Sequence, residues 1–233
     1  MAAESHLFRY DKTFWHFNRI STNFKEKKKK KVKKRFNKPM VKNVKIRTYP
    51  YIYPKPISLI GAIVDGKPNF FALADITNSD YNPPRITISC AKNHYTAVGI
   101  KDHSEFSVSM PSEEMLKITD YCGLVSGKKW NKSDIFDVYY GELDNAPLIN
   151  NAPISMGCKL VKTIDFGDTH YIFIGEIIEC YAREDCLTEK NKPDFLKMRA
   201  IVWSSIDNMY YKVGHAVGKA YKIGRELKKK YQL

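Results

Sequence analysis

The sequence lacks the cysteine pattern of a disulfide framework and the paired spacing of a zinc site. Its five cysteines are an odd number, and no Cys-x-x-Cys pair occurs, so reduced thiols in a cytoplasmic protein are the simpler interpretation. No apolar run approaches the ~20 residues that cross a bilayer, and charged residues interrupt the N-terminus where a signal peptide is apolar. We therefore expect a cytoplasmic protein without a membrane segment or a metal site.

Familiar nucleotide-binding and catalytic motifs are also missing. The segment Gly123–Lys129 looks like a P-loop, but it is one residue short and lacks the hydroxyl residue that holds Mg²⁺ after the lysine. No Gly-x-Gly-x-x-Gly follows an expected strand, so a Rossmann site is unsupported. Gly-x-Ser-x-Gly and His-Glu-x-x-His are absent as well. These absences argue against the enzyme classes that such motifs mark.

Positive charge is plentiful, but it is concentrated in one segment. Of the net charge of +14, residues 1–39 carry +10, from 13 Lys and Arg against 3 acidic residues, and the remaining residues carry +4, from 26 against 22. Such a lysine block has no apolar face to bury, so residues 1–39 are predicted to be a disordered extension before a globular domain over 40–233. Met40 is alternatively the true start of the protein. Nucleic acid is not expected as a partner except through residues 1–39.

The body of the chain has the pattern of a mainly β protein. Strand-like runs alternate with turn signals, of which Asp65-Gly66 and Asp165–Asp168 predict hairpins. Ser112 is expected to cap a helix whose first turn carries Glu113 and Glu114. Many strands with short helices between them favour a barrel over a doubly wound sheet. Strands are expected over 57–64, 69–74, 85–91, 105–110, 155–164, 171–181 and 200–204, and helices over 96–103, 113–123 and 214–230.

Two clusters of small and polar residues carry the chemical signal. The first follows an expected strand at Ala74–Ser79, and the second, Ser89–Thr96, leads into the expected helix at Thr96. Hydroxyl groups and Lys92 beside a helix N-terminus suit a phosphate, because free backbone N–H groups and the helix dipole favour an anion. The plain structural alternative is that Thr96 only caps the helix and that Lys92 is a solvated surface charge.

The order of motifs resembles the flavin reductase-like, FMN-binding split-barrel family, and within it the flavoredoxin branch. The resemblance covers roughly residues 48–228, and its strength lies in the order and spacing of motifs that are individually weak. The matching segments are Tyr53–Ile57, Ile60–Ala62, Val64–Asn69, Pro83-Pro84, Tyr95-Thr96, Phe106–Val108, Pro111-Ser112, Asp120–Gly123, Ser126-Gly127, Ala146–Ile149, Gly167-Asp168, Phe173–Glu176, Tyr210-Tyr211 and 214–224.

This resemblance implies a split β-barrel with short helices and a C-terminal helix, and a homodimer with one FMN per barrel near the subunit interface. The first cluster would face the isoalloxazine ring, and the second would serve the ribityl chain and phosphate. The implied FMN-binding residues are Ala74, Asp75, Ile76 and Thr77, then Ser89, Cys90, Ala91, Lys92 and Thr96, with His94 and Tyr95 adjacent. The chain departs from many relatives at Asp75 and Asp80, and a carboxylate near the ring would disfavour an anionic reduced flavin.

Three functions remain open at this point. The first is an oxidoreductase in which NAD(P)H reduces bound FMN, which passes electrons to an acceptor; the second is a non-enzymatic carrier that exchanges electrons with protein partners. The third is a nucleic-acid-binding protein that acts through the basic segment. No side chain is assigned a catalytic role, because the flavin itself performs the central step. Cys90 is expected to be a core or ring-contacting residue, since no base lies beside it in the sequence.

Overall fold

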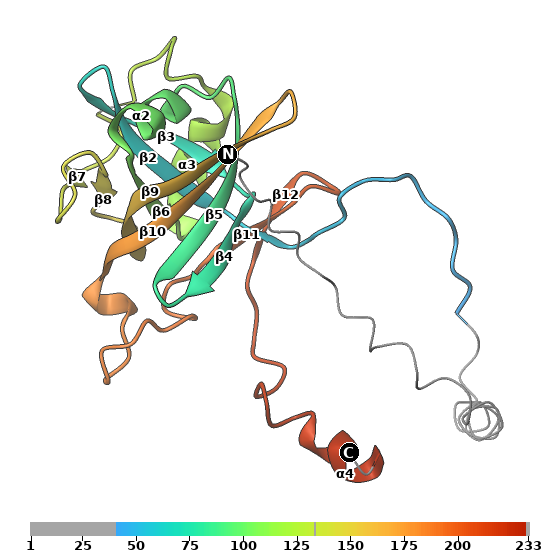
Figure 1. Cartoon of the computed structure of the whole chain (residues 1–233). Helices are drawn as coiled ribbons and strands as arrows, with labels where there is room; N and C mark the ends of the chain where they lie inside the picture. Colours follow the sequence, from blue (N-terminus) through green and yellow to red (C-terminus); the bar gives the residue numbers. More distant parts are fainter. Residues whose placement is uncertain (1–40, 133, 232–233) are drawn as a thin grey trace, which may run out of the picture. The chain divides into compact units, whose positions relative to one another are not determined.

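A computed structural model describes residues 41–132 and 134–231 (Figure 1). The lysine-rich extension predicted over residues 1–39 lies outside the described residues, so the domain boundary at Met40 stays a prediction. Residues 41–49 contain no helix or strand, and by their contacts they group apart from the residues that begin at Pro50. The fold described below belongs to residues 50–231.

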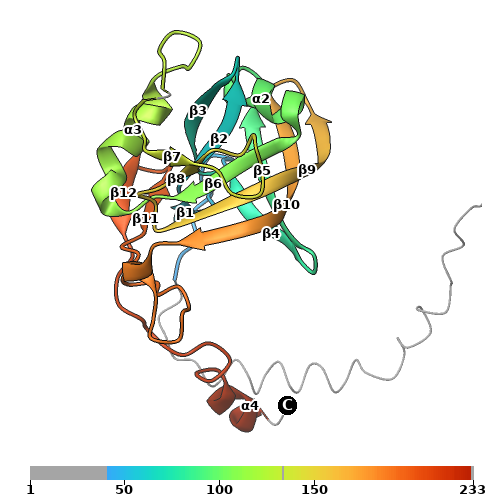
Figure 2. The same cartoon turned by 90° about the vertical axis from the view of Figure 1, so that its left-hand side faces the viewer.

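A seven-stranded antiparallel sheet forms the body of the fold, with the strand order β3-β2-β6-β9-β10-β5-β4 (Figure 2). The two edge strands, β3 and β4, are consecutive in the chain and are separated only by Ala74 and Asp75. The sheet therefore curls until its edges approach at these two residues, which is the arrangement of a split barrel. The strands are β2 Ser58–Val64, β3 Lys67–Leu73, β4 Ile76–Tyr81, β5 Pro84–Ala91, β6 Glu105–Met110, β9 Ile154–Phe166 and β10 His170–Ala182.

Local sequence explains most of this sheet. In β5 every second side chain is buried, at Ile86, Ile88 and Cys90, as the period of a half-buried strand requires. The turn between β2 and β3 has positive φ at Asp65 (49°) and Gly66 (73°), which the hairpin turn predicted there needs. Strand β4 was not predicted, since its side chains are almost all exposed and it forms only through pairing with β5.

The helix α2, Thr96–His103, has the predicted bounds and packs against β2. The close approach needs Gly99, because a Cβ there would lie 2.1 Å from the carbonyl oxygen of Ile63. The capping role predicted for Ser112 is wrong. The short 3₁₀ helix η2, Glu113–Met115, begins after Ser112, whose hydroxyl forms no capping hydrogen bond and is buried without a partner among the described residues. Helix α3, Leu116–Leu124, follows directly.

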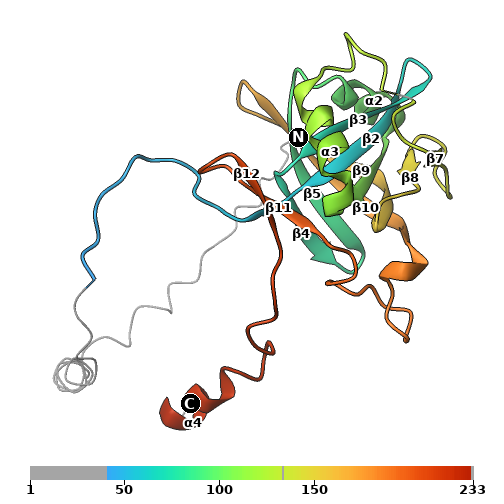
Figure 3. The same ribbon diagram turned by 180° about the vertical axis from the view of Figure 1, so that it is seen from behind.

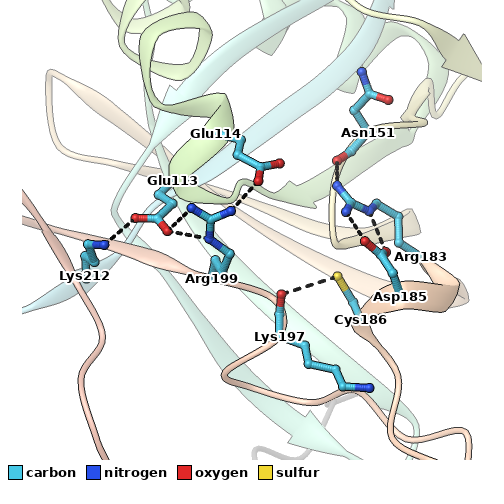
Figure 4. Close-up of polar contacts among 9 residues, drawn as sticks. All are labelled: Glu113, Glu114, Asn151, Arg183, Asp185, Cys186, Lys197, Arg199 and Lys212. Atoms are coloured by element: carbon cyan, nitrogen blue, oxygen red, sulfur yellow. Dashed lines mark hydrogen bonds and ion pairs between the residues drawn. The ribbon is translucent and has the colours of Figure 1, made fainter.

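A second sheet of three strands has the order β1-β11-β12, with β1 Lys55–Pro56, β11 Ile201–Ser204 and β12 Met209–Lys212 (Figure 2). Figure 3 shows β11 and β12 from behind. Figure 4 shows how charge ties this sheet to η2: Arg199 pairs with both Glu113 and Glu114, and Lys212 Nζ lies 2.9 Å from Glu113 Oε2. These hydrogen bonds hold the pKa of Glu113 below its ordinary value. The short strands β7 Val138–Tyr139 and β8 Leu148–Ile149 form a separate pair.

The helix predicted over 214–230 is wrong in its extent. Residues 213–219 have no regular structure, and the helix α4 spans only Arg225–Tyr231. The predicted range 214–230 contains Gly214, Gly218 and Gly224. Each glycine costs about 1 kcal/mol in a helix relative to alanine. These costs explain why the helix forms only after the last of the three glycines.

Candidate functional site

A cavity of about 220 Å³, here called the inner pocket, lies between β3, the start of α2 and the end of α3. The predicted site residues His94, Tyr95 and Thr96 line it together. The remaining lining residues are Asn69, Phe71, Ala72, Asn93, Cys122, Gly123, Leu124, Val125, Ser126, Gly127 and Lys132. One part of the second polar cluster therefore faces a real cavity.

The start of α2 presents free backbone donors at this pocket. Tyr95 occupies the N-cap position with helical backbone angles and provides no side-chain cap. Among the described residues, the N–H groups of Tyr95 and Thr96 donate no backbone hydrogen bond. The first turn of α2 also contains no acidic residue. Free N–H groups and the positive end of the helix dipole together favour an anionic ligand group.

Thr96 is buried inside this arrangement, with 1% of its surface exposed. Its Oγ1 accepts a hydrogen bond of 2.6 Å from Nδ2 of Asn69 on β3. Thr96 is the first residue of the helix, and the N-cap is Tyr95, so the alternative in which Thr96 merely caps α2 is wrong. Because a hydroxyl both accepts and donates, its own proton remains available for a second acceptor.

Cys90 and His94 lie together at the base of this region. Cys90 Sγ is 3.7 Å from His94 Nδ1, and the His94 ring meets the Phe71 ring edge-on at 4.6 Å between centroids. Burial raises the pKa of the Cys90 thiol to about 12 and lowers the pKa of His94. His94 is therefore a base beside Cys90 in space, although no base adjoins Cys90 in the sequence. The high pKa nevertheless keeps the sulfur protonated, which agrees with a core role.

Lys92 points away from the inner pocket. Its Nζ donates to the carbonyl of Gly167, in the turn after β9, at 2.9 Å, and it pairs with Asp165 near the end of β9. The bond to Asp165 raises the pKa of Lys92. Lys92 is therefore a surface charge, as the structural alternative supposed, held in an ion pair with Asp165, and it does not line the cavity. Ser89, Cys90 and Ala91 lie on β5 beside the pocket and do not line it either.

The first cluster lies where the edges of the sheet approach each other, at Ala74–Thr77, which we call the seam. The second cluster lies next to it. The carbonyl of Asp75 accepts a hydrogen bond of 2.9 Å from the Ser89 N–H, and Ile76 and Thr77 pair with Ile88 and Thr87. The Asp75 carboxylate is bound by Lys55 Nζ at 2.5 Å. The structure thus joins the two clusters side by side, with Ala74 to Thr77 outside the inner pocket.

Most residues that line the pocket were not predicted from the sequence as site residues, and three of them show how the pocket is built. Asn69 orients Thr96, and Gly127 packs so closely that a Cβ there would lie 2.1 Å from Asn69 Oδ1 and 2.8 Å from the Tyr95 ring. Lys132 is 2% exposed, and its Nζ donates to the carbonyls of Phe70 (2.9 Å) and Cys122 (3.2 Å). Burial lowers the pKa of Lys132. The Gly123–Lys129 segment fails as a P-loop, yet much of it lines this cavity.

Two negative findings concern residues 41–132 and 134–231. This part of the chain brings no three His, Cys, Asp or Glu side chains together in a way that could hold a metal ion. None of the helices described there has the length and apolar character to cross a membrane.

Comparison with known proteins gives a consistent result. The family model described as "Flavin reductase like domain" matches residues 51–204. The structure is similar to flavoredoxin from Methanosarcina acetivorans, with 43% identity, 80% of this chain and 100% of that chain covered, and a TM-score of 0.78. It is also similar to flavoredoxin of Desulfovibrio vulgaris (Miyazaki F), with 30% identity, 78% and 100% coverage, and a TM-score of 0.72.

A more distant match shares the fold alone. An FMN-binding protein from Thermus thermophilus is 19% identical, with 78% of this chain and 99% of that chain covered and a TM-score of 0.65. The family match and the two flavoredoxin structures together support a flavin as the cofactor of this fold.

Proposed function

We propose, since the chain belongs to the flavin reductase-like family in its flavoredoxin branch, that it binds FMN and transfers a hydride or electrons through it. The observation that carries the proposal is the joining of two predicted clusters. The seam at Ala74–Thr77 lies beside β5, and β5 leads directly to the free N–H donors at the start of α2.

The size and polarity of the inner pocket suit the anionic end of FMN. At about 220 Å³ it is smaller than the ~300–1,000 Å³ typical of small-molecule sites, so it would take one end of the molecule. In this proposal the phosphate meets the N–H groups of Tyr95 and Thr96 and the Thr96 hydroxyl. The buried Lys132 adds positive charge nearby, whereas Lys92 would have to leave Asp165 to take part.

The flat ring would then lie along the seam. One side of the ring would be lined by Ala74, Ile76 and Thr77. The adjacent strand β5 would contact the ring through Ser89, Cys90 and Ala91, and His94 would lie between the ring and the phosphate. Small side chains such as Ala74 and Ala91 let a ring approach the backbone closely. The pairing of Asp75 with Lys55 offsets the negative charge that would otherwise disfavour an anionic reduced flavin.

Bound FMN would supply the hydride and electron transfer, and the chain's residues would bind and orient it. No catalytic side chain is assigned. His94, neutral through burial, contributes no charge beside the ring. The inner pocket is too small to enclose a whole FMN, which favours a homodimer in which a second copy covers the exposed part of the flavin, as the family resemblance implies.

The electron donor separates two versions of this function. In the first, NADH or NADPH reduces the flavin, and the protein is an NAD(P)H-dependent oxidoreductase of the cytoplasm. In the second, the protein is an electron carrier between protein partners, which the similarity to two flavoredoxins favours. Both versions require the same flavin site.

The visible spectrum of the purified protein tests the proposal. We expect a yellow protein with about one FMN per chain and a size-exclusion mass of a dimer. Anaerobic addition of NADH or NADPH that bleaches the flavin band would support the reductase. A flavin band unchanged by both nucleotides would support the carrier, and a colourless protein that also fails to bind added FMN would contradict both.

A further inference from the structure

A second cavity, of about 310 Å³, lies between the turn after β2 and the segment 127–132. We name it the lysine pocket, because Lys67, Lys128, Lys129 and Lys132 line it. It shares Asn69, Tyr95, Gly127 and Lys132 with the inner pocket, so a ligand in one lies next to a ligand in the other.

The charge of the lysine pocket is not balanced. Asp65 is the one acidic residue among the described residues that line it, and its carboxylate accepts a hydrogen bond from the Tyr95 hydroxyl. Within the described part of the chain, none of the four lysine ammonium groups forms an ion pair with a carboxylate. Like charges held together around a concave surface repel one another, and a bound anion relieves this repulsion.

An aromatic ring lines the same cavity. Trp130 is 60% exposed, although a large apolar side chain gains by burial. It lies in sequence between Lys129 and Lys132, so its neighbours in the pocket are cationic. Aromatic rings stack on nucleobases regardless of base identity, while lysines attract phosphate. Trp130 and the lysines together match a ligand that carries both a planar base and phosphate groups.

We infer that the lysine pocket is a subsite for the adenosine phosphate part of a dinucleotide electron donor. Trp130 stacks on the adenine, and Lys67, Lys128 and Lys129 contact the phosphates. Lys132 adds buried positive charge at the wall shared with the inner pocket. The choice of a dinucleotide rests on the proposed flavin function. The subsite itself is separable from that function, because its residues can be tested with a nucleotide that carries no redox group.

The experiment measures ADP binding to the purified full-length protein by calorimetry, with flavin content recorded from the visible spectrum of the same sample. ADP contains the base and the diphosphate but cannot reduce flavin. We expect saturable binding of ADP and weaker binding of adenosine and of inorganic pyrophosphate, since each offers only half of the contacts. A lack of ADP binding at millimolar concentration would overturn the inference, whatever the flavin content.

Two variants test the residues, and one serves as a control. Lys128→Gln combined with Lys129→Gln should raise the Kd for ADP at least about fivefold, in the range of two partly screened charge pairs. Trp130→Leu should raise it by roughly tenfold through lost stacking. Lys162→Gln, on the exposed part of β9, removes a charge outside the pocket and should leave the Kd unchanged. Equal affinities in all four proteins would refute the subsite.

Other ligands that carry a base and phosphates, namely FAD and RNA, would give different binding results. If the nucleotide belonged to FAD, the lysine variants would lose FAD affinity but keep the wild-type dependence on NADH and NADPH, which would overturn the donor assignment. If the pocket bound RNA, an oligonucleotide would displace ADP at lower concentration than NADH does. Competition of NADH or NADPH with ADP, lost in the double lysine variant, supports the donor. Failure of the flavin proposal is seen separately, as a colourless protein.

Discussion

The inner pocket and the lysine pocket share a wall but differ in how their polar groups are held. In the inner pocket the Thr96 hydroxyl bonds Asn69, and His94 packs against Phe71 beside Cys90. In the lysine pocket, Lys67, Lys128 and Lys129 are exposed, and their ammonium groups form no ion pair within the described residues. One cavity is lined by oriented, partly buried groups and the other by solvated charges.

This difference indicates two kinds of ligand. Pre-oriented groups lose little conformational entropy on binding and therefore suit a tightly held cofactor. The attraction between solvated lysines and an anion is weakened by salt, so a bound ligand dissociates readily. This suits a substrate that exchanges in each turnover. The wall formed by Asn69, Tyr95, Gly127 and Lys132 makes the two sites neighbours, so substitutions can be chosen to affect both sites or one.

The largest effect is expected at the shared wall, from Gly127→Val. A Cβ at Gly127 would lie 2.1 Å from Asn69 Oδ1, and Asn69 is buried and bound to Thr96. Relief of this contact would displace Asn69 or the Tyr95 ring, which line both pockets, so flavin affinity should fall by about two decades. Binding of flavin and of ADP should both weaken, as measured by titration.

A matched control for this change is Gly123→Ala, which also lies at the inner pocket. Its Cβ would meet only the Cβ of Ala72 at 3.6 Å, an ordinary contact. Flavin affinity should stay at the wild-type level. A Gly127→Val protein that binds flavin as well as the control does would show that the wall is not shared in the way described.

The next effect, from Thr96→Ala, should be confined to the inner pocket. Removal of the hydroxyl takes away a donor to the proposed phosphate and leaves Asn69 without its acceptor. A hydrogen bond to a charged group is worth ~1.5–3 kcal/mol, so FMN should bind one to two decades more weakly, and riboflavin, which has no phosphate, should lose less. Equal losses for both flavins would assign Thr96 a structural role only.

A buried threonine elsewhere provides the comparison. Thr119 lies on α3 with 0% exposure, and its hydroxyl has no partner among the described residues. Thr119→Ala should change neither FMN nor riboflavin affinity. Titration of the Thr96→Ala and Thr119→Ala proteins, each with FMN and with riboflavin, separates a local effect at the proposed phosphate position from a general loss of stability.

The two pockets also show what sequence could and could not predict. The bounds of α2 and the hairpin at Asp65-Gly66 follow from local signals, and both were predicted. Strand β4 was missed, because Ile76–Tyr81 has no apolar alternation and depends on its partner β5. The clusters at 74–79 and 89–96 were recognised, but their joining where the edges of the sheet approach depends on strand pairing.

The walls of the pockets were harder to foresee. Lys132 stands in a polar stretch with no local feature that predicts burial, and its acceptors, the carbonyls of Phe70 and Cys122, come from other elements. Gly127 was considered only as part of a failed P-loop, while its actual role is close packing against Asn69 and Tyr95. Lys92 was assigned to a phosphate from sequence proximity, yet the structure pairs it with Asp165 on β9.

A smaller effect concerns the pH dependence of stability, through His94. Burial, and then the nearby His170 and Lys132, hold the pKa of His94 below its ordinary value. The unfolded chain takes up a proton below the ordinary pKa of about 6.5, and the folded protein does so only at lower pH. The free energy of unfolding should therefore decrease as the pH falls below about 6.5.

His94→Gln should reduce this loss, and the urea midpoint at pH 7 and pH 5.5 measures it. His103→Gln, at the exposed end of α2, should retain the wild-type difference between the two pH values. If both variants and the wild type lose stability equally on acidification, another group is responsible.

The smallest effect is expected at Cys90, which tests whether the inner pocket contains a reactive group. Burial raises its pKa to about 12, so the thiol stays protonated at pH 8, and the thiolate is the nucleophile. Cys180, on β10, is exposed and offers the reagent an accessible thiol on the same chain. With N-ethylmaleimide and mass spectrometry of the digested protein, Cys180 should be modified while Cys90 stays free, and flavin content should not change. Rapid modification of Cys90 in the folded protein, with loss of flavin, would mean that its pairing with His94 activates the sulfur and that the inner pocket contains a nucleophile after all.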